Sequence, residues 1–163
     1  MQILNNQSII VQNLLYYKCV THKKDIWDII DHINKHIETI GLHKTGQTIT
    51  SIEDIEQSDC INLEVLTPID SSFEEKSSFS FLPQFKLLYA VKIRHEGNIG
   101  NLTTSQKILE EYLEAHSYEA ITKYYNVIVR HDSDIMANSI IDIYVGINPN
   151  IINSPNNQKI SRN

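Results

Sequence analysis

The sequence contains few of the residues that mark several common kinds of functional site. Its 5 glycines do not fall in a phosphate-binding order such as GxGxxG or GxxxxGK. Its 2 cysteines, Cys19 and Cys60, are far apart and lack metal-ligand spacing, so they are predicted to be free thiols rather than a disulfide. No apolar run is long enough to span a membrane. The sequence therefore predicts a cytoplasmic protein that uses no cofactor.

Positive charge is also scarce. The chain has 14 Lys and Arg against 20 Asp and Glu, which gives a net charge of −6. Binding to a phosphate backbone needs clustered basic residues, and no helix-turn-helix pattern is readable. Direct contact with nucleic acid is therefore not predicted, and neither is contact with a membrane. A hydrophobic content of 41% in 163 residues is enough for one compact domain.

What the sequence does contain is the same pattern of elements twice. Residues 9–20 are typical of a strand, 25–41 of a helix, and 45–52 and 61–69 of two further strands. Residues 87–95, 102–116, 124–130 and 140–147 repeat this order. The pattern predicts a duplicated β-α-β-β unit in a single domain over residues 1–150. The repeats would cover about residues 9–70 and 85–149, followed by a polar tail over 151–163.

The predicted helices would each cover one face of the sheet. Isoleucines recur at helical spacing from Ile26 to Ile40 and form a single apolar stripe. The fold class predicted is α+β, with a mixed antiparallel sheet and both helices on one face. Strand alternation then directs Asp142 and Tyr144 to the opposite face, and Glu64 occupies the matching place in the first half.

Several short segments resemble one known family. The run from Tyr89 to Gly97, the pair Ile26-Trp27 ahead of the first helix, and the run from Glu64 to Ile69 are similar to GyrI-like domains, also called AraC-type effector-binding domains. The resemblance implies a pseudo-symmetric domain with a central cleft for small, often cationic and aromatic molecules. It also implies a ligand-supporting carboxylate on the last strand. Asp142 stands there, where the family more often has Glu.

The resemblance and the strand pattern together give a set of candidate ligand-binding residues. Carboxylates beside aromatic rings suit a cation through charge and ring quadrupole. The set is Asp142, Tyr144, Glu64, Trp27, Tyr89, Tyr124 and Tyr17. The alternative is that the two acids are simply solvated on an exposed sheet face. His32 and His36 have the i, i+4 spacing of zinc ligands but lie off the isoleucine stripe, so no metal or catalytic site is predicted.

Three functions are compatible with these features. The first is a free-standing, non-enzymatic binding module that sequesters a small organic ligand or modulates a partner protein. The second is an accessory or immunity-like interaction protein with a degenerate pocket, for example one encoded in a toxin-associated locus. The third is a small hydrolase, since a few GyrI-like proteins use a Tyr and a Glu for hydrolysis. A ligand binder needs a cavity of about 300 Å³ or more. The chain is expected to be a monomer or a homodimer.

Overall fold

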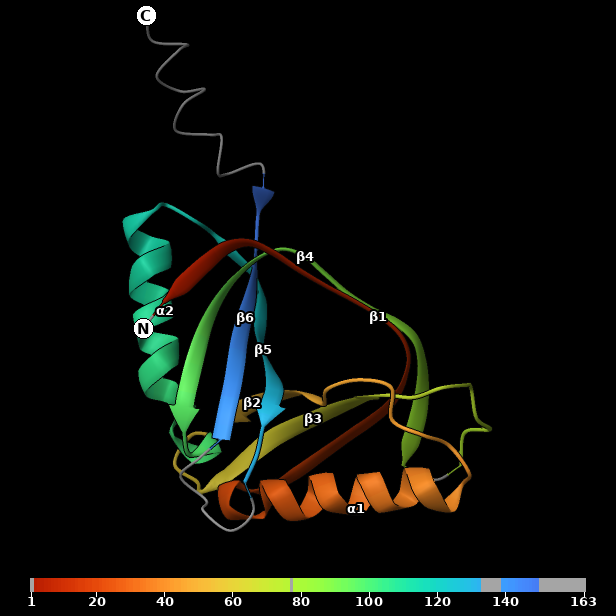
Figure 1. Ribbon diagram of the computed structural model, residues 1–163. Helices are drawn as coiled ribbons and strands as arrows, with labels where there is room; N and C mark the ends of the chain where they lie inside the picture. The colour runs from red at the N-terminus through yellow and green to blue at the C-terminus, as the bar shows by residue number, and fades with distance from the viewer. Residues whose placement is uncertain (1, 77, 133–138, 150–163) are drawn as a thin grey trace, which may run out of the picture.

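The chain folds into an α+β barrel, shown in Figure 1 as a computed structural model that describes residues 2–76, 78–132 and 139–149. Its elements are β1 (Ile3–His22), a 3-10 turn (Lys23–Asp25), α1 (Ile26–Thr39), β2 (Ile49–Asp54), β3 (Cys60–Pro68), β4 (Phe79–Gly97), a second 3-10 turn (Ile99–Asn101), α2 (Leu102–Ala115), β5 (Ala120–Arg130) and β6 (Ser139–Ile147). The order strand, helix, strand, strand occurs in both halves. That the halves arose by duplication stays a prediction, and the predicted tail lies outside the described residues.

The strands close into a barrel in the order β1-β3-β2-β5-β6-β4. Every pairing between these strands is antiparallel, whereas the sequence predicted a mixed sheet. The reason is that β3 lies between β1 and β2, and β6 lies between β4 and β5. The strands that precede and follow each helix are therefore never direct neighbours.

The pairings between neighbouring strands differ greatly in length. β1 and β4 are the long strands, and they pair from Ile3 to Tyr17 of β1, arching over the barrel in Figure 1. β2 and β5 are joined only by the pairs Ile49–Val127 and Thr50–Asn126. The pairing of β2 with β5, which connects the two halves of the chain on this side of the barrel, is therefore short.

Both helices pack on the outer face of the barrel. In Figure 1, α1 runs along the base and α2 stands beside β4. They share one apolar cluster with the outward side chains of the strands. Its helical members are Ile26, Ile30, Ile33, Ile37, Leu102, Leu109 and Leu113, and its strand members include Leu63, Val65, Ile93, Ile141 and Ile143. The inner face of the barrel is thus left for a separate set of residues. Among the described residues, no helix is long and apolar enough to cross a membrane.

The two helices end in the same backbone geometry. After α1, the amide of Leu42 donates to the carbonyl of Ile37 at 3.0 Å, and Gly41 has φ of +81°. After α2, the amide of Tyr118 donates to the carbonyl of Leu113 at 2.9 Å, and Ser117 has φ of +55°. This left-handed C-terminal turn suits glycine, so Ser117 occupies it at a conformational cost.

Candidate functional site

The inner face of the barrel carries a second apolar cluster, distinct from the one under the helices. Its buried members are Leu14, Ile49, Leu66, Phe85, Leu87, Ala90 and Val127. The half-buried side chains of Tyr16, Tyr125 and Tyr144 pack against it. These residues come from all six strands, so the barrel closure itself assembles the cluster.

Two cavities adjoin this inner face. The first, of about 590 Å³, lies between the middle of β1 and the strands opposite. Its lining is mixed, with apolar side chains and Tyr144 beside polar ones, namely Ile9, Val11, Ile49, Val127 and Tyr144 together with Ser8, Gln12, Thr45 and Gln47. The second, of about 600 Å³, is lined by Gln2, Leu4, Lys92, Arg94 and Glu96. Lys92 of the second cavity and Tyr144 of the first are partners in the register of β4 and β6, so the two cavities adjoin at this pair. We call the two cavities together the inner cleft.

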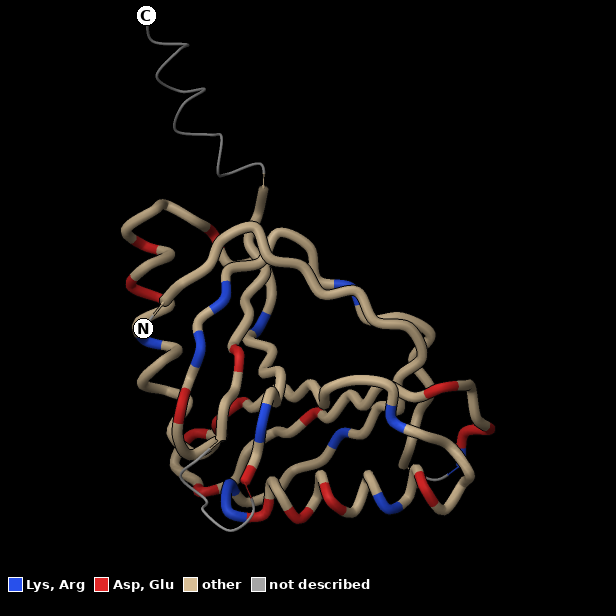
Figure 2. The backbone as a smooth tube through the Cα atoms, in the orientation of Figure 1, with Lys and Arg blue, Asp and Glu red and all other residues tan. Residues whose placement is uncertain are grey.

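Asp142 lies beside the inner cleft, at the centre of a charge cluster with Lys92 and Arg94 of its lining. Its side chain is only 7% exposed. Arg94 binds it through two atoms, with Nε donating to Oδ1 at 2.7 Å and Nη2 donating to Oδ2 at 3.0 Å. Lys92 Nζ donates to Oδ2 at 3.4 Å. Burial by itself would raise the pKa of Asp142, but these hydrogen bonds and positive charges hold its pKa below the usual value. The register of β4 and β6 places Arg94 directly opposite Asp142, and Figure 2 shows Lys and Arg positions along β4.

Glu64 on β3 is held in a similar way by residues from two other strands. Lys123 of β5 forms an ion pair with it, and the hydroxyl of Tyr16 of β1 donates to its other oxygen. Burial would raise the pKa of Glu64, yet the hydrogen bonds from Lys123 and Tyr16 bring the pKa below its usual value. Burial, together with the hydrogen bond to Glu64, raises the pKa of Tyr16. Glu64 is therefore ionised and Tyr16 is neutral at pH 7.

Aromatic rings also pack on the inner face of the barrel, beside the inner cleft. Phe85 and Tyr125 meet edge to face, with ring centroids 4.9 Å apart. Lys92 Nζ lies 5.8 Å from the ring centroid of Tyr144. Among the described residues, the hydroxyls of Tyr125 and Tyr144 have no hydrogen-bond partner. Burial raises the pKa of both phenols, so they remain neutral donors at pH 7.

Three of the candidate residues from the sequence meet on this inner face, namely Asp142, Tyr144 and Glu64. Their role in binding a ligand stays a prediction. The sequence treated the two carboxylates as available to a ligand, whereas the structure pairs both with cations of the chain itself. The cause is cross-strand register, which places Arg94 directly opposite Asp142.

The other four candidates lie elsewhere. Tyr17 and Tyr124 pack on the helix side, Tyr17 against Phe79 and Tyr124 with its hydroxyl donating to Glu110 at 3.0 Å. Trp27 also lies there and stacks on the ring of His131, with centroids 3.5 Å apart. Tyr89 is 54% exposed and has φ of +54°. The structure therefore does not bring these four rings to the inner cleft.

The residues that sequence reasoning did not assign to the site are mainly cations. Lys92 and Arg94 are two positions apart on one strand, which is a readable sign of a shared face. Lys123 gives no such signal, because its contact with Glu64 joins strands from different halves of the chain. Among the described residues, no group of His, Cys, Asp or Glu could hold a metal ion, and both cysteines are free.

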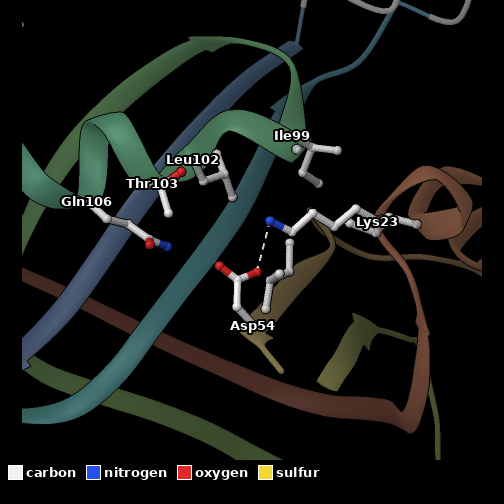
Figure 3. A pocket seen from close by; sticks show the side chains of 9 residues that line it. Lys23, Asp54, Ile99, Leu102, Thr103 and Gln106 are labelled. Atoms are coloured by element: carbon white, nitrogen blue, oxygen red, sulfur yellow. Dashed lines mark ion pairs between the residues drawn. The ribbon is translucent and has the colours of Figure 1, made fainter. Parts of the chain in front are cut away.

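A smaller hollow lies outside the barrel, between the starts of the two helices. Figure 3 shows Lys23 and Asp54 pointing toward each other across it, and their ion pair measures 3.0 Å. Thr103 and Gln106 of α2 form its far wall (Figure 3). Its volume of about 30 Å³ is too small for an organic molecule. The inner cleft is therefore the better candidate for a ligand site.

Comparison with known proteins supports this fold. No family model and no curated protein sequence matches the chain. The crystal structure of the EcmrR C-terminal domain matches with a TM-score of 0.67 at 15% identity, over 91% of this chain and 99% of that one. The chain has the GyrI-like fold. The resemblance seen in the sequence is thus confirmed at the level of fold.

Other proteins with the GyrI-like fold differ in what they do. EcmrR in its cryo-EM complex with DNA matches with a TM-score of 0.74 at 15% identity over 90% of this chain, which spans only 57% of that longer chain. SAV2435 bound to tetraphenylphosphonium matches with a TM-score of 0.51 at 9% identity, over 91% and 93% of the two chains. A hydrolase from Listeria innocua matches with a TM-score of 0.55 at 10% identity, over 90% and 91%.

Proposed function

We propose that the chain is a non-enzymatic small-molecule-binding protein whose inner cleft holds a compact aromatic molecule. The observation that carries this proposal is the pair of cavities of about 590 and 600 Å³ on the face opposite the helices. Each lies within the size range of ligand pockets. The first cavity offers apolar side chains such as Ile9 and Val11 for a ring, and polar ones such as Gln12 and Gln47 that can orient it. The binding of tetraphenylphosphonium by SAV2435, which shares the fold, is consistent with it.

The bound molecule would either be sequestered or alter the contact of the chain with a partner protein. An interaction protein that had lost its pocket would have a filled barrel. The inner cleft instead leaves Ile9, Val11 and Tyr144 around open space. The open space favours the hypothesis of a ligand-binding protein over that of an interaction protein without a pocket.

The hydrolase hypothesis is best supported by the hydrogen-bonded pair of Tyr16 and Glu64, because this pair lies on the inner face of the barrel. Its electrostatics are unsuited to catalysis, however. Lys123 and Tyr16 lower the pKa of Glu64, which makes it a weak general base, and a raised pKa keeps Tyr16 a poor nucleophile. We therefore place binding ahead of hydrolysis.

A thermal-shift measurement with 2-naphthol and tetraphenylphosphonium tests the proposal. A ligand that binds only the native state at one hundred times its Kd adds about 2.7 kcal/mol of stability. In a domain of this size, each kcal/mol raises Tm by roughly 2–4 °C. At least one probe should therefore raise Tm by several degrees.

The variant Ile9→Trp locates the site. Ile9 lines the first cavity, so the larger ring should occupy the space and abolish the shift. Ile121→Trp is the matched control, because Ile121 is 57% exposed and is not part of either cavity lining. If the increase in Tm persists in Ile9→Trp, or if neither probe raises Tm, the inner cleft is not the binding site.

A further inference from the structure

Another cavity lies on the helix side of the barrel and takes no part in the proposed function. Its volume is about 300 Å³, at the lower end of the range for ligand pockets. Its walls come from α1, from the residues that lead into β2, and from the end of β5. We call this cavity the outer pocket.

The α1 wall of the outer pocket supplies hydrogen-bond acceptors. Asp31 and Asn34 both line the pocket and lie three positions apart on α1, so they are neighbours on one face of the helix. Oδ1 of Asn34 is buried and has no hydrogen-bond partner among the described residues. A buried acceptor without a partner is costly, so a donor bound beside it would be stabilising. Asp31 is exposed at the rim, and it forms no ion pair with any residue that the structure describes.

The wall that leads into β2 supplies hydrogen-bond donors. Lys44 Nζ donates to Oγ1 of Thr48 at 3.0 Å, and both residues line the pocket. Within the described ranges, no carboxylate lies at ion-pair distance from Lys44. Partial burial without such a partner lowers the pKa of Lys44. Thr48 is buried, and its hydroxyl accepts from Lys44 and keeps its own proton to donate.

The apolar part of the outer pocket is mainly aliphatic. Ile30 of α1 and Ile128 and Val129 of β5 line it. Trp27 lines it too, but its ring is already stacked on that of His131, with centroids 3.5 Å apart. These walls suit a small aliphatic group.

We propose that the outer pocket binds a small zwitterion with an aliphatic body, such as an aliphatic α-amino acid. The ammonium group donates to Asn34 Oδ1 and to Asp31, and the carboxylate accepts from Lys44 and Thr48. The aliphatic group lies against Ile30. The two unpaired charges of the lining are of opposite sign, so they match a zwitterion and give no advantage to a ligand with a single charge. Hydrogen bonds to charged groups are stronger than neutral ones.

The chain contains its own probe for this pocket, because Trp27 is its single tryptophan. Titrations followed by tryptophan fluorescence compare L-leucine, L-leucinamide and 4-methylpentanoate, which share one aliphatic body. Leucinamide lacks the carboxylate and 4-methylpentanoate lacks the ammonium group. Leucine should bind at least about tenfold more tightly than either analogue, because each analogue loses one set of charge-assisted hydrogen bonds.

Two variants assign the charged ends of the ligand. Lys44→Met should weaken leucine at least about tenfold and leave leucinamide unchanged, and the retained leucinamide affinity shows that the variant folds. Asp31→Asn should weaken leucine and leucinamide but not 4-methylpentanoate. Lys35→Met is the matched control for Lys44→Met, because Lys35 is exposed on α1 outside the pocket lining, and it should change no affinity.

Three results would overturn the inference. The first is equal or tighter binding of leucinamide or 4-methylpentanoate, which would show that the pocket does not select a zwitterion. The second is a leucine affinity that Lys44→Met leaves unchanged. The third is the absence of any change in fluorescence or Tm with leucine. The proposed function of the inner cleft is tested separately with 2-naphthol and tetraphenylphosphonium, so it stands or fails independently of these results.

Discussion

Replacing Asp142 with Asn should destabilise the barrel, because Asp142 is the single buried anion between two cations. Its side chain is 7% exposed and that of Lys92 is 16% exposed, whereas that of Arg94 is 47% exposed, so water can replace only part of the lost attraction. Removing one partner of a buried ion pair typically costs about 3–5 kcal/mol. Asn keeps the shape and one acceptor, so we expect a loss of about 2–4 kcal/mol. In a domain of this size, that lowers Tm by roughly 5–15 °C.

The assay is urea unfolding of wild type and variant, followed across pH. The cations hold the pKa of Asp142 low in the folded state, so its stabilisation is present above the unfolded pKa, near about 4. It is lost as pH falls through the folded pKa, and the gap between the two proteins should close in acid. Asp54→Asn is the matched control, because the Lys23–Asp54 pair is 41% and 54% exposed and should contribute less than about 1 kcal/mol. A loss below about 0.5 kcal/mol, or a gap that does not change with pH, would refute the reasoning.

Two further predictions concern the backbone. Ser117→Gly should raise stability by about 0.5–1 kcal/mol in thermal unfolding, because Ser117 has φ of +55° at the end of α2; Gly41→Ser, at the matching place after α1, should lower it. Gly146→Ala should lower stability by about 1–3 kcal/mol in the same assay, because a Cβ there would lie 2.7 Å from Thr122 Cγ2 and 3.0 Å from Leu87 Cδ1. A neutral Gly146→Ala would mean that β5 shifts to make room.

Much of the fold could be predicted because the spacing of apolar residues along the sequence indicates where the helices and strands lie. The isoleucine stripe from Ile26 to Ile37 marks α1, and all four buried side chains of that helix belong to it. Gly41 marks its end. The expected helix over residues 102–116 agrees with α2 to within one residue. The strand directions in the sheet were harder to predict. Whether two neighbouring strands run parallel depends on the strand order, and here β3 lies between β1 and β2 and β6 lies between β4 and β5.

The faces of β1 and β5 could not be predicted from hydrophobicity alone. Leu14 and Leu15 are adjacent and both fully buried, one in each cluster, so β1 has no polar face to fix the alternation. As a result Tyr16, not Tyr17, lies on the inner face of the barrel. In β5 a register shift between Ala120 and Tyr124 precedes the tyrosine pair, and it is Tyr125 that faces inward. Irregular positions of this kind leave no clear mark in a single sequence.

The two carboxylates on the inner face of the barrel occupy matching strands but join different parts of it. Asp142 is bound by Lys92 and Arg94, which lie on the neighbouring strand of the same half. Glu64 belongs to the first half and is bound by Lys123 of the second half. The contact crosses the side of the barrel where β2 and β5 share only two residue pairs. Lys123 therefore adds a contact across the side of the barrel with the shortest strand pairing, β2 with β5. Arg94 instead adds a contact to the pairing of β4 with β6, which backbone hydrogen bonds already hold together. An alteration at Arg94 therefore removes the bidentate partner of the buried Asp142 but leaves the contact across the β2–β5 side intact, whereas an alteration at Lys123 weakens that contact itself.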